Sequence, residues 1–113
     1  MTHSLALALK AANFPQGKPK IGQFWYINGV LMYARDYSSP LFLSSNTELP
    51  GHFVYCPTAQ DILEALPSSC SVSKGLSGFV VKHQYHKEEF RIHTGPTLAE
   101  ALGNAYLAIY PQP

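Results

Sequence analysis

Residues 23–35 contain the dipeptide Asn28-Gly29 between two apolar runs. Asn-Gly readily forms a two-residue type I′ turn, because both of its residues tolerate a positive φ. The sequence therefore predicts an antiparallel hairpin, and its register follows by counting outward from the turn. The expected pairs are Ile27–Val30, Tyr26–Leu31, Trp25–Met32, Phe24–Tyr33 and Gln23–Ala34.

Both faces of this hairpin are apolar, whereas a sheet with one solvated face alternates apolar and polar side chains. One face carries Trp25, Ile27, Val30 and Met32, and the other carries Phe24, Tyr26, Leu31 and Tyr33. One face can pack as core, and the other needs a cover from a loop or helix of the same chain, from a second copy or from a partner. The alternative is that the two tyrosines lie half-exposed with their hydroxyls in water.

The charge balance argues against a nucleic-acid partner. The net charge is +1 and 13% of the residues are charged, whereas nucleic-acid binders normally show a basic excess or stripe. No apolar run approaches the roughly 20 residues of a membrane-spanning helix, and residues 1–13 lack the basic region of a signal peptide. We therefore expect a protein of the cytoplasm that binds neither nucleic acid nor membrane.

Three helices are predicted from capping residues and apolar stripes. Their ranges are Ser4–Ala12, Thr58–Leu66 and Thr97–Ile109. Thr58 and Thr97 each precede an acidic residue three positions later, which is the pattern of a capping box. The residues of the central helix that are expected to point inward are Ile62, Leu63 and Leu66.

Further strands are predicted where apolar and aromatic residues alternate. Their ranges are His52–Cys56, Phe79–Tyr85 and Phe90–Thr94, with a short strand at Leu41–Leu43 inside a long excursion. Residues 86–89 form a polar turn between the strands of the second hairpin, and Pro67–Gly78 is expected to be a Ser- and Gly-rich loop.

The predicted elements place the chain in the α+β class. We expect a single domain over residues 1–113. Its sheet is a meandering antiparallel one of four to five strands, with an N-terminal, a central and a C-terminal helix packed mainly on one face. A chain of this length supports one hydrophobic core without disulfides.

Four short motifs carry a resemblance to a known family. They are Phe14-Pro15-Gln16 after the first helix, Trp25-Tyr26 in a strand, Tyr55-Cys56-Pro57-Thr58 at a helix start, and Thr97-x-x-Glu100-Ala101-Leu102 near the end. In this succession the sequence resembles a family of small uncharacterised proteins carried by phages and prophages. The resemblance implies an origin in a bacteriophage or integrated element and action in the cytoplasm of the bacterial host, and it implies no activity. The sequence departs from the family pattern by its longer 36–51 excursion and its longer second hairpin turn.

Histidine is the residue type that offers a metal site in this sequence. His83, His86 and His93 cluster around the second hairpin. In a regular strand His83 shares a face with Tyr85, His86 lies in the turn, and His93 lies on the face of Arg91, so the three imidazoles are not expected to converge. We interpret them as polar surface histidines and expect no metal.

The two cysteines, Cys56 and Cys70, belong to no CxxC or Cys/His motif, so a zinc site is not expected. We expect free thiols, with a disulfide as the alternative. Cys56 lies at a strand end before a proline, where burial is more common than a role as a nucleophile. No serine lies in a GxSxG motif and no glycine-rich phosphate loop is present, so we expect no catalytic residue and no cofactor.

Two hypotheses about function follow. The first is a non-enzymatic accessory protein that binds a host or phage protein, or a second copy of itself, through the aromatic hairpin. The second is a protein that binds or sequesters a flat, nucleotide-like ligand, which stacks on Trp25, Tyr26 and Tyr33 while Arg35, Lys82 or Arg91 contacts its phosphates. A metal-dependent or cysteine enzyme is a distant third. The candidate binding residues are Phe24, Trp25, Tyr26, Leu31, Tyr33 and Arg35.

Overall fold

The computed structural model describes residues 1–36 and 53–111. These residues form three helices and two three-stranded antiparallel sheets, so the predicted α+β class is confirmed. The prediction of one meandering sheet of four to five strands is wrong, because the described strands divide into two sheets. The predicted strand Leu41–Leu43 lies outside the described residues.

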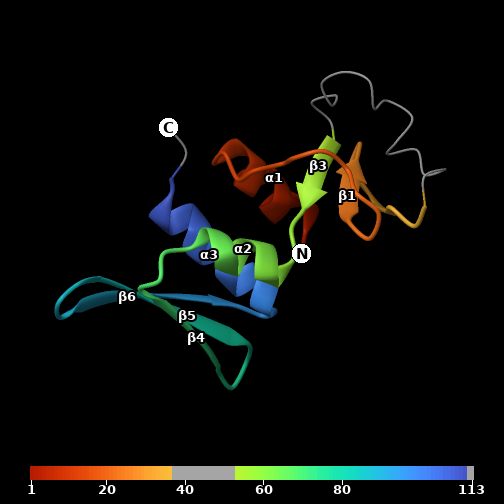
Figure 1. The fold of residues 1–113 in the computed structure, drawn as a ribbon. Coiled ribbons are helices and arrows are strands. Elements are labelled where there is room, and N and C mark those ends of the chain that lie inside the picture. The colour runs from red at the N-terminus through yellow and green to blue at the C-terminus, as the bar shows by residue number, and fades with distance from the viewer. Residues whose placement is uncertain (37–52, 112–113) are drawn as a thin grey trace. The chain divides into compact units, whose positions relative to one another are not determined.

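The chain divides into two compact units, Thr2–Pro57 and Thr58–Pro113. Figure 1 shows one sheet in each unit, with β1 and β3 labelled in the first and β4, β5 and β6 in the second. Of the described helices, one belongs to the first unit and two belong to the second. The expectation of a single domain stays a prediction.

The first helix, α1 (His3–Ala11), begins and ends one residue earlier than the predicted range Ser4–Ala12. The side-chain oxygen of Thr2 accepts a hydrogen bond from the backbone N–H of Leu5 at 3.2 Å, which satisfies one of the free amides of the first turn. Asn13 follows the helix with a φ of 65°, a left-handed conformation that asparagine tolerates and that ends the helix.

The first sheet has the strand order β2–β1–β3 and is antiparallel throughout. Its strands are β1 (Phe24–Ile27), β2 (Val30–Tyr33) and β3 (Phe53–Cys56). Asn28 and Gly29 join β1 to β2 with φ values of 51° and 79°, as a type I′ turn requires. The register is the predicted one, and it pairs Phe24 with Tyr33 at the end away from the turn.

Trp25 is the centre of this sheet and is completely buried. Its indole N–H donates to Oε1 of Gln23 at 3.1 Å, and its ring lies 5.2 Å from that of Tyr55 on β3. Two long side chains also bind the backbone of β3. Lys10 of α1 donates from Nζ to the carbonyl of Phe53 at 2.8 Å, and Oε1 of Gln16 accepts from the Tyr55 amide at 2.9 Å.

The second unit begins with α2 (Ala59–Ala65), whose predicted capping box is confirmed. The Asp61 amide donates to Oγ1 of Thr58 at 3.1 Å, and the Thr58 amide donates to Oδ2 of Asp61 at 2.9 Å. Ile62 and Leu66 are buried as predicted, but Leu63 is 42% exposed. The inward orientation predicted for Leu63 is therefore wrong. Ile62 and Leu66 lie four positions apart on the buried face of the helix. Leu63 is turned about 100° from Ile62 around the helix axis and lies outside that face.

The second sheet has the strand order β4–β5–β6. Its strands are β4 (Cys70–Lys74), β5 (Phe79–His86) and β6 (Glu89–Gly95). β4 lies inside the Pro67–Gly78 segment that was expected to be a loop. The four-residue turn expected at residues 86–89 is also wrong, because His86 pairs with Glu89 and leaves two residues in the turn.

A bulge interrupts the pairing of β5 with β6. Gln84 pairs with Phe90 and His86 pairs with Glu89, so that Tyr85 is the extra residue on β5. A bulge changes which side chains face the same side of a sheet, because side chains alternate with a period of two. Beyond the bulge, His83 therefore lies directly opposite Arg91.

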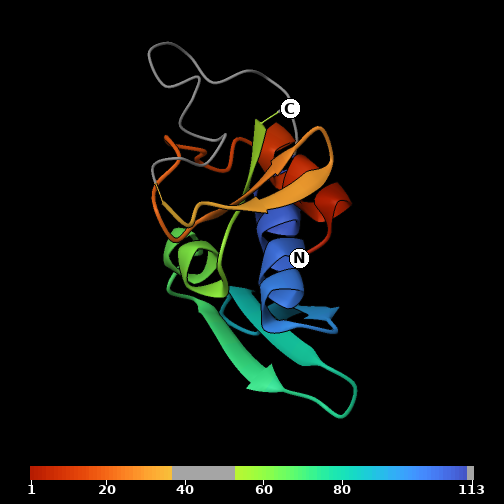
Figure 2. The same ribbon diagram turned by 90° about the vertical axis from the view of Figure 1, so that its right-hand side faces the viewer.

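The last helix, α3 (Leu98–Ile109), packs on β5 and β6, and α2 packs on α3. Both helices lie on the same side of the second sheet in Figures 1 and 2. The side-chain oxygen of Thr97 accepts from the Glu100 amide at 3.2 Å, so the predicted start of α3 is confirmed. Val81, on the side of the sheet that α3 covers, is completely buried.

Candidate functional site

The predicted binding residues of the first hairpin divide into a buried and an exposed group. Trp25 and Tyr26 are 0% and 7% exposed, respectively. The exposed group is Phe24, Leu31, Tyr33 and Arg35. Two of the three residues expected to stack on a ligand are thus covered, and the accessible part of the hairpin lies mainly on β2.

Three of the exposed side chains form one patch, which we call the hairpin patch: Phe24, Leu31 and Tyr33. Their exposed fractions are 43%, 47% and 50%. Phe24 and Tyr33 are paired across the strands with ring centroids 4.8 Å apart, and Leu31 lies two positions before Tyr33 on the same face of β2. The patch is therefore a contiguous apolar surface.

Tyr26 lies on the same face as the hairpin patch but is covered from within its own unit. The ring of His3, at the start of α1, lies 4.9 Å from the Tyr26 ring. His3 also lies over the turn, because its Cε1 atom is 3.6 Å from the position that a Cβ atom would take on Gly29. Burial, followed by the nearby Cys56 thiol, raises the pKa of Tyr26 above its ordinary value. The first helix is thus an internal cover for part of this face, which is one of the alternatives that the sequence leaves open.

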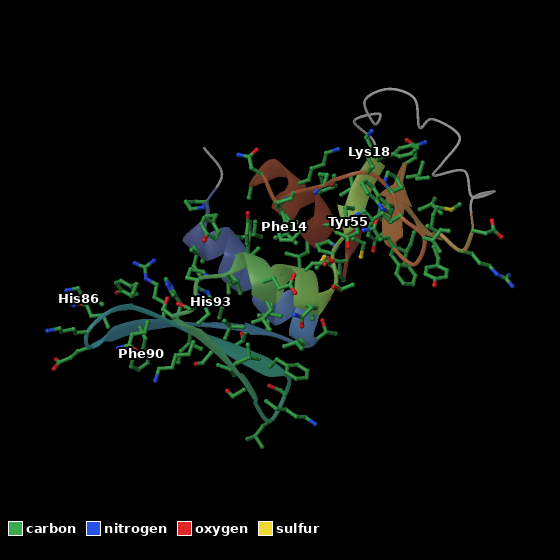
Figure 3. The ribbon with its side chains drawn as sticks, in the orientation of Figure 1. Phe14, Lys18, Tyr55, His86, Phe90 and His93 are labelled. Atoms are coloured by element: carbon green, nitrogen blue, oxygen red, sulfur yellow. The ribbon has the colours of Figure 1, made fainter. Side chains whose placement is uncertain are left out.

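The histidines of the second hairpin separate into two places. His83 and His93 line one pocket together with Tyr85 and Arg91, whereas His86 lies at the turn end of the hairpin, away from His93 (Figure 3). Within residues 1–36 and 53–111, no group of three His, Cys, Asp or Glu side chains is arranged to hold a metal ion. The sequence did not predict the approach of His83 to Arg91, because it follows from the bulge at Tyr85.

Both cysteines are free and half-buried. Burial raises the pKa of Cys56 and that of Cys70 above the ordinary value of a thiol. A raised pKa keeps the sulfur protonated at neutral pH, whereas a nucleophilic cysteine requires a lowered one. The geometry therefore gives no support to a cysteine nucleophile at either position.

Comparison of the chain with protein-family models, with curated proteins and with solved structures found no match. None of the helices in the described part of the chain has the length and apolar character needed to cross a bilayer. The hairpin patch and the pocket between β5, β6 and α3 are two accessible surfaces of the described residues.

Proposed function

We propose that this protein acts by binding another protein through the hairpin patch. The observation that carries the proposal is the contiguity of Phe24, Leu31 and Tyr33, each at least 43% exposed, on one face of the first sheet. Single exposed apolar side chains are ordinary on protein surfaces, but a contiguous aromatic and charge-poor group is the composition of an interface core.

The sheet beneath the patch supports this role because its strands are already paired in one register. The type I′ turn fixes the register of β1 and β2, and the completely buried Trp25 anchors β1 in the core. A patch on a preformed sheet loses little conformational entropy on binding, so more of its apolar burial contributes to affinity.

The resemblance to phage and prophage proteins suggests the setting of this interaction. We infer a host or phage protein as the partner, in the cytoplasm of the bacterial host, with a homodimer as the second form of the same interaction. Among the described strands, β2 lies at the edge of its sheet. A partner strand that pairs with this edge would extend the sheet and place its own side chains beside Leu31 and Tyr33 on the same face.

The flat-ligand hypothesis for the hairpin is less well supported. It requires Trp25, Tyr26 and Tyr33 to stack on a ligand, and the first two of these are buried. In the described chain, the cations that lie over aromatic rings belong to the second sheet, where Lys82 stacks on Phe90 and Arg91 stacks on Tyr85. A broad apolar patch without a stacked cation favours a protein partner over a phosphate-bearing ligand.

Replacing Tyr33 and Tyr26 separately with serine tests the proposal. We expect Tyr33→Ser to change the free energy of unfolding by less than about 0.5 kcal/mol, because exposed substitutions are usually near neutral. Tyr26→Ser is expected to cost about 3 kcal/mol, because it removes a buried aromatic ring. Urea denaturation measures both values.

Binding is then measured by affinity capture from phage-infected or expressing bacteria and by sedimentation of the purified protein. Val30→Ser is the matched control, because Val30 is 60% exposed on the opposite face of the same strand. We expect Tyr33→Ser to lose the captured protein or the dimer, and Val30→Ser to keep it. If Tyr33→Ser unfolds, or if it binds as the wild type does, the hairpin patch is not the binding surface.

A further inference from the structure

A pocket of about 210 Å³ lies between the second hairpin and the end of α3. Its lining residues are His83, Tyr85, Arg91, His93, Ala108 and Ile109. All of them belong to the second unit, so the pocket is formed within one compact part of the chain. The hairpin patch contributes nothing to it, and the inference drawn from it is independent of the proposed function.

The bulge at Tyr85 gives this pocket its chemistry. A regular hairpin counted outward from the His86–Glu89 pair would place Gln84 opposite Arg91. The bulge instead places His83 opposite Arg91, and His93 follows two positions later on the same face of β6. Directly opposed and diagonal positions on one face lie within about 4.5 to 8 Å of each other at Cβ. Bulges often occur next to functional sites, where they redirect a side chain.

The polar lining consists of one guanidinium, two imidazoles and a phenol, with no carboxylate among the lining residues. Arg91 is held by Tyr85, whose ring centroid lies 5.0 Å from the guanidinium carbon. The Nε2 atom of His93 is buried and has no hydrogen-bond partner within the described residues. Burial of a polar atom without a partner costs free energy, so the environment of His93 is not satisfied by the described residues alone.

We propose that this pocket binds a small oxyanion, namely phosphate or the phosphate group of a small molecule. The planar fork of Arg91 matches two oxygens of such a group. The imidazoles of His83 and His93 supply further donors, and the ring of Tyr85 gives an apolar wall. A divalent metal does not fit as well, because the guanidinium lies among the same side chains and repels it.

One feature of the fold opposes an anion here. Ala108 and Ile109 are the last residues of α3, and the C-terminal end of a helix carries partial negative charge. This effect is modest and is screened at exposed positions, whereas hydrogen bonds between a guanidinium and an oxyanion are charge-assisted and short. The alternative partner of the Arg91 guanidinium is the group of carbonyls at the C-terminal end of α3. The titration with phosphate distinguishes this alternative from anion binding.

Anion binding is expected to strengthen as the pH falls. The pKa of His93 lies below its ordinary value. The main cause is burial of the ring, and the nearby His83 and Arg91 lower the pKa further. A bound anion stabilises the imidazolium and raises that pKa, so protonation and binding favour each other below about pH 6.5. The other groups that face His93 do not reverse this sign. β4 contributes the protonated thiol of Cys70 opposite His83, and the charged residue of α3, Glu100, lies at the opposite end of that helix.

The test is an NMR titration of the ring signals of His83 and His93 in the full-length protein. Sodium phosphate is added against sodium chloride at equal ionic strength. Arg91→Gln removes the proposed ligand. Lys82→Gln is the matched control, because it removes the same charge from the opposite face of β5, where Lys82 lies 3.9 Å from the Phe90 ring centroid. Sodium sulfate, whose charge is constant in this range, replaces phosphate for the comparison of about pH 6 with about pH 8.

We expect saturable shifts with phosphate in the wild type and in Lys82→Gln. In Arg91→Gln the affinity for phosphate should be lower by about tenfold or more. Sulfate should bind the wild type more tightly at the lower pH. Backbone amide spectra confirm that each variant is folded. Three results overturn the proposal: no saturable shift with phosphate in the wild type, equal weakening in both variants, which would indicate general surface charge, or unchanged binding in Arg91→Gln.

Discussion

Thr58 and Thr97 are alike in sequence context but make different numbers of hydrogen bonds. Thr58 takes part in both bonds of a capping box with Asp61. At Thr97 the side chain accepts from the Glu100 amide, and the described contacts hold no return bond from the Glu100 carboxylate. The sequence predicts both helix starts, but the longer Glu side chain has more freedom to remain in solvent.

We predict that Thr58→Ala lowers the free energy of unfolding by about 1 to 2 kcal/mol and Thr97→Ala by about 0.5 to 1 kcal/mol. The difference reflects the second bond of the box at Thr58. Chemical denaturation of the two variants measures both values, and Thr→Ser at each position should recover most of the loss because serine keeps the oxygen. An equal or larger loss at Thr97 would contradict this assignment.

Individual exposures were harder to predict than helix starts. The pattern of the first hairpin places Tyr26 and Tyr33 on one face, and the structure agrees. Their burial differs because His3 of α1 covers Tyr26 and does not reach Tyr33. This cover comes from an element outside the hairpin, so the residue pattern of the hairpin alone cannot predict that one tyrosine is buried and the other exposed.

Among the elements, α3 approaches the second sheet closely at Gly95. A Cβ atom placed on Gly95 would lie 2.5 Å from the Ala101 nitrogen and 2.8 Å from the Glu100 carbon. These are backbone atoms of the first turns of α3, which cannot move away as the end of a side chain can. The absence of a side chain at Gly95 is therefore a condition for packing α3 on β6.

We predict that Gly95→Ala lowers the free energy of unfolding by about 1 to 3 kcal/mol, the usual cost of overpacking. Gly75→Ala is the control in the same unit, because its added Cβ would meet Val80 at 3.4 Å and the Gly78 carbonyl at 3.5 Å, which are ordinary contacts. Thermal or urea denaturation compares the two. Equal stability of the variants would show that α3 can shift away from β6.

The two predicted hairpins differ in how well their strand register can be predicted from the sequence. Asn28-Gly29 determines a two-residue turn and with it every pair of the first hairpin. The second hairpin has no such dipeptide, and its bulge at Tyr85 leaves no clear mark in the sequence. β4 was missed because its serines resemble a loop, although Cys70 and Val72 alternate with them at the period of a strand.

At the scale of the whole molecule, the sequence predicts the class of the fold but not the division of its strands. Hairpin pairs are local, and they follow from the turns. The assignment of β3 to the first sheet depends on its pairing with β1, which lies far away in the chain, and no local pattern records this contact, whereas β4 pairs with the neighbouring β5. The pocket with His83 and Arg91 was missed for a related reason, since it needs both the bulge and the end of α3.

Each unit contains one cysteine, and both cysteines are free. We predict that unreduced, denatured protein titrates with two thiols per chain. In the native state both should react slowly, because burial raises the pKa of each thiol and the thiolate is the reactive form. A titration with Ellman's reagent measures the count and the rates. A count of zero, with a monomer on a denaturing gel, would establish a disulfide instead.

The position of β1 between β2 and β3 also has a consequence for the order of folding. β1 pairs on one side with the strand that follows it after two residues, and on the other side with a strand that begins only at Phe53. Local pairs form fast, whereas distant ones must first overcome the entropy of closing a long segment. The hairpin that carries the proposed binding patch should therefore form early, and one edge of β1 stays open until β3 arrives. In a newly synthesised chain this open edge of β1 is where a wrong strand can pair until β3 occupies it, and Lys10 and Gln16 hydrogen-bond to backbone groups of β3.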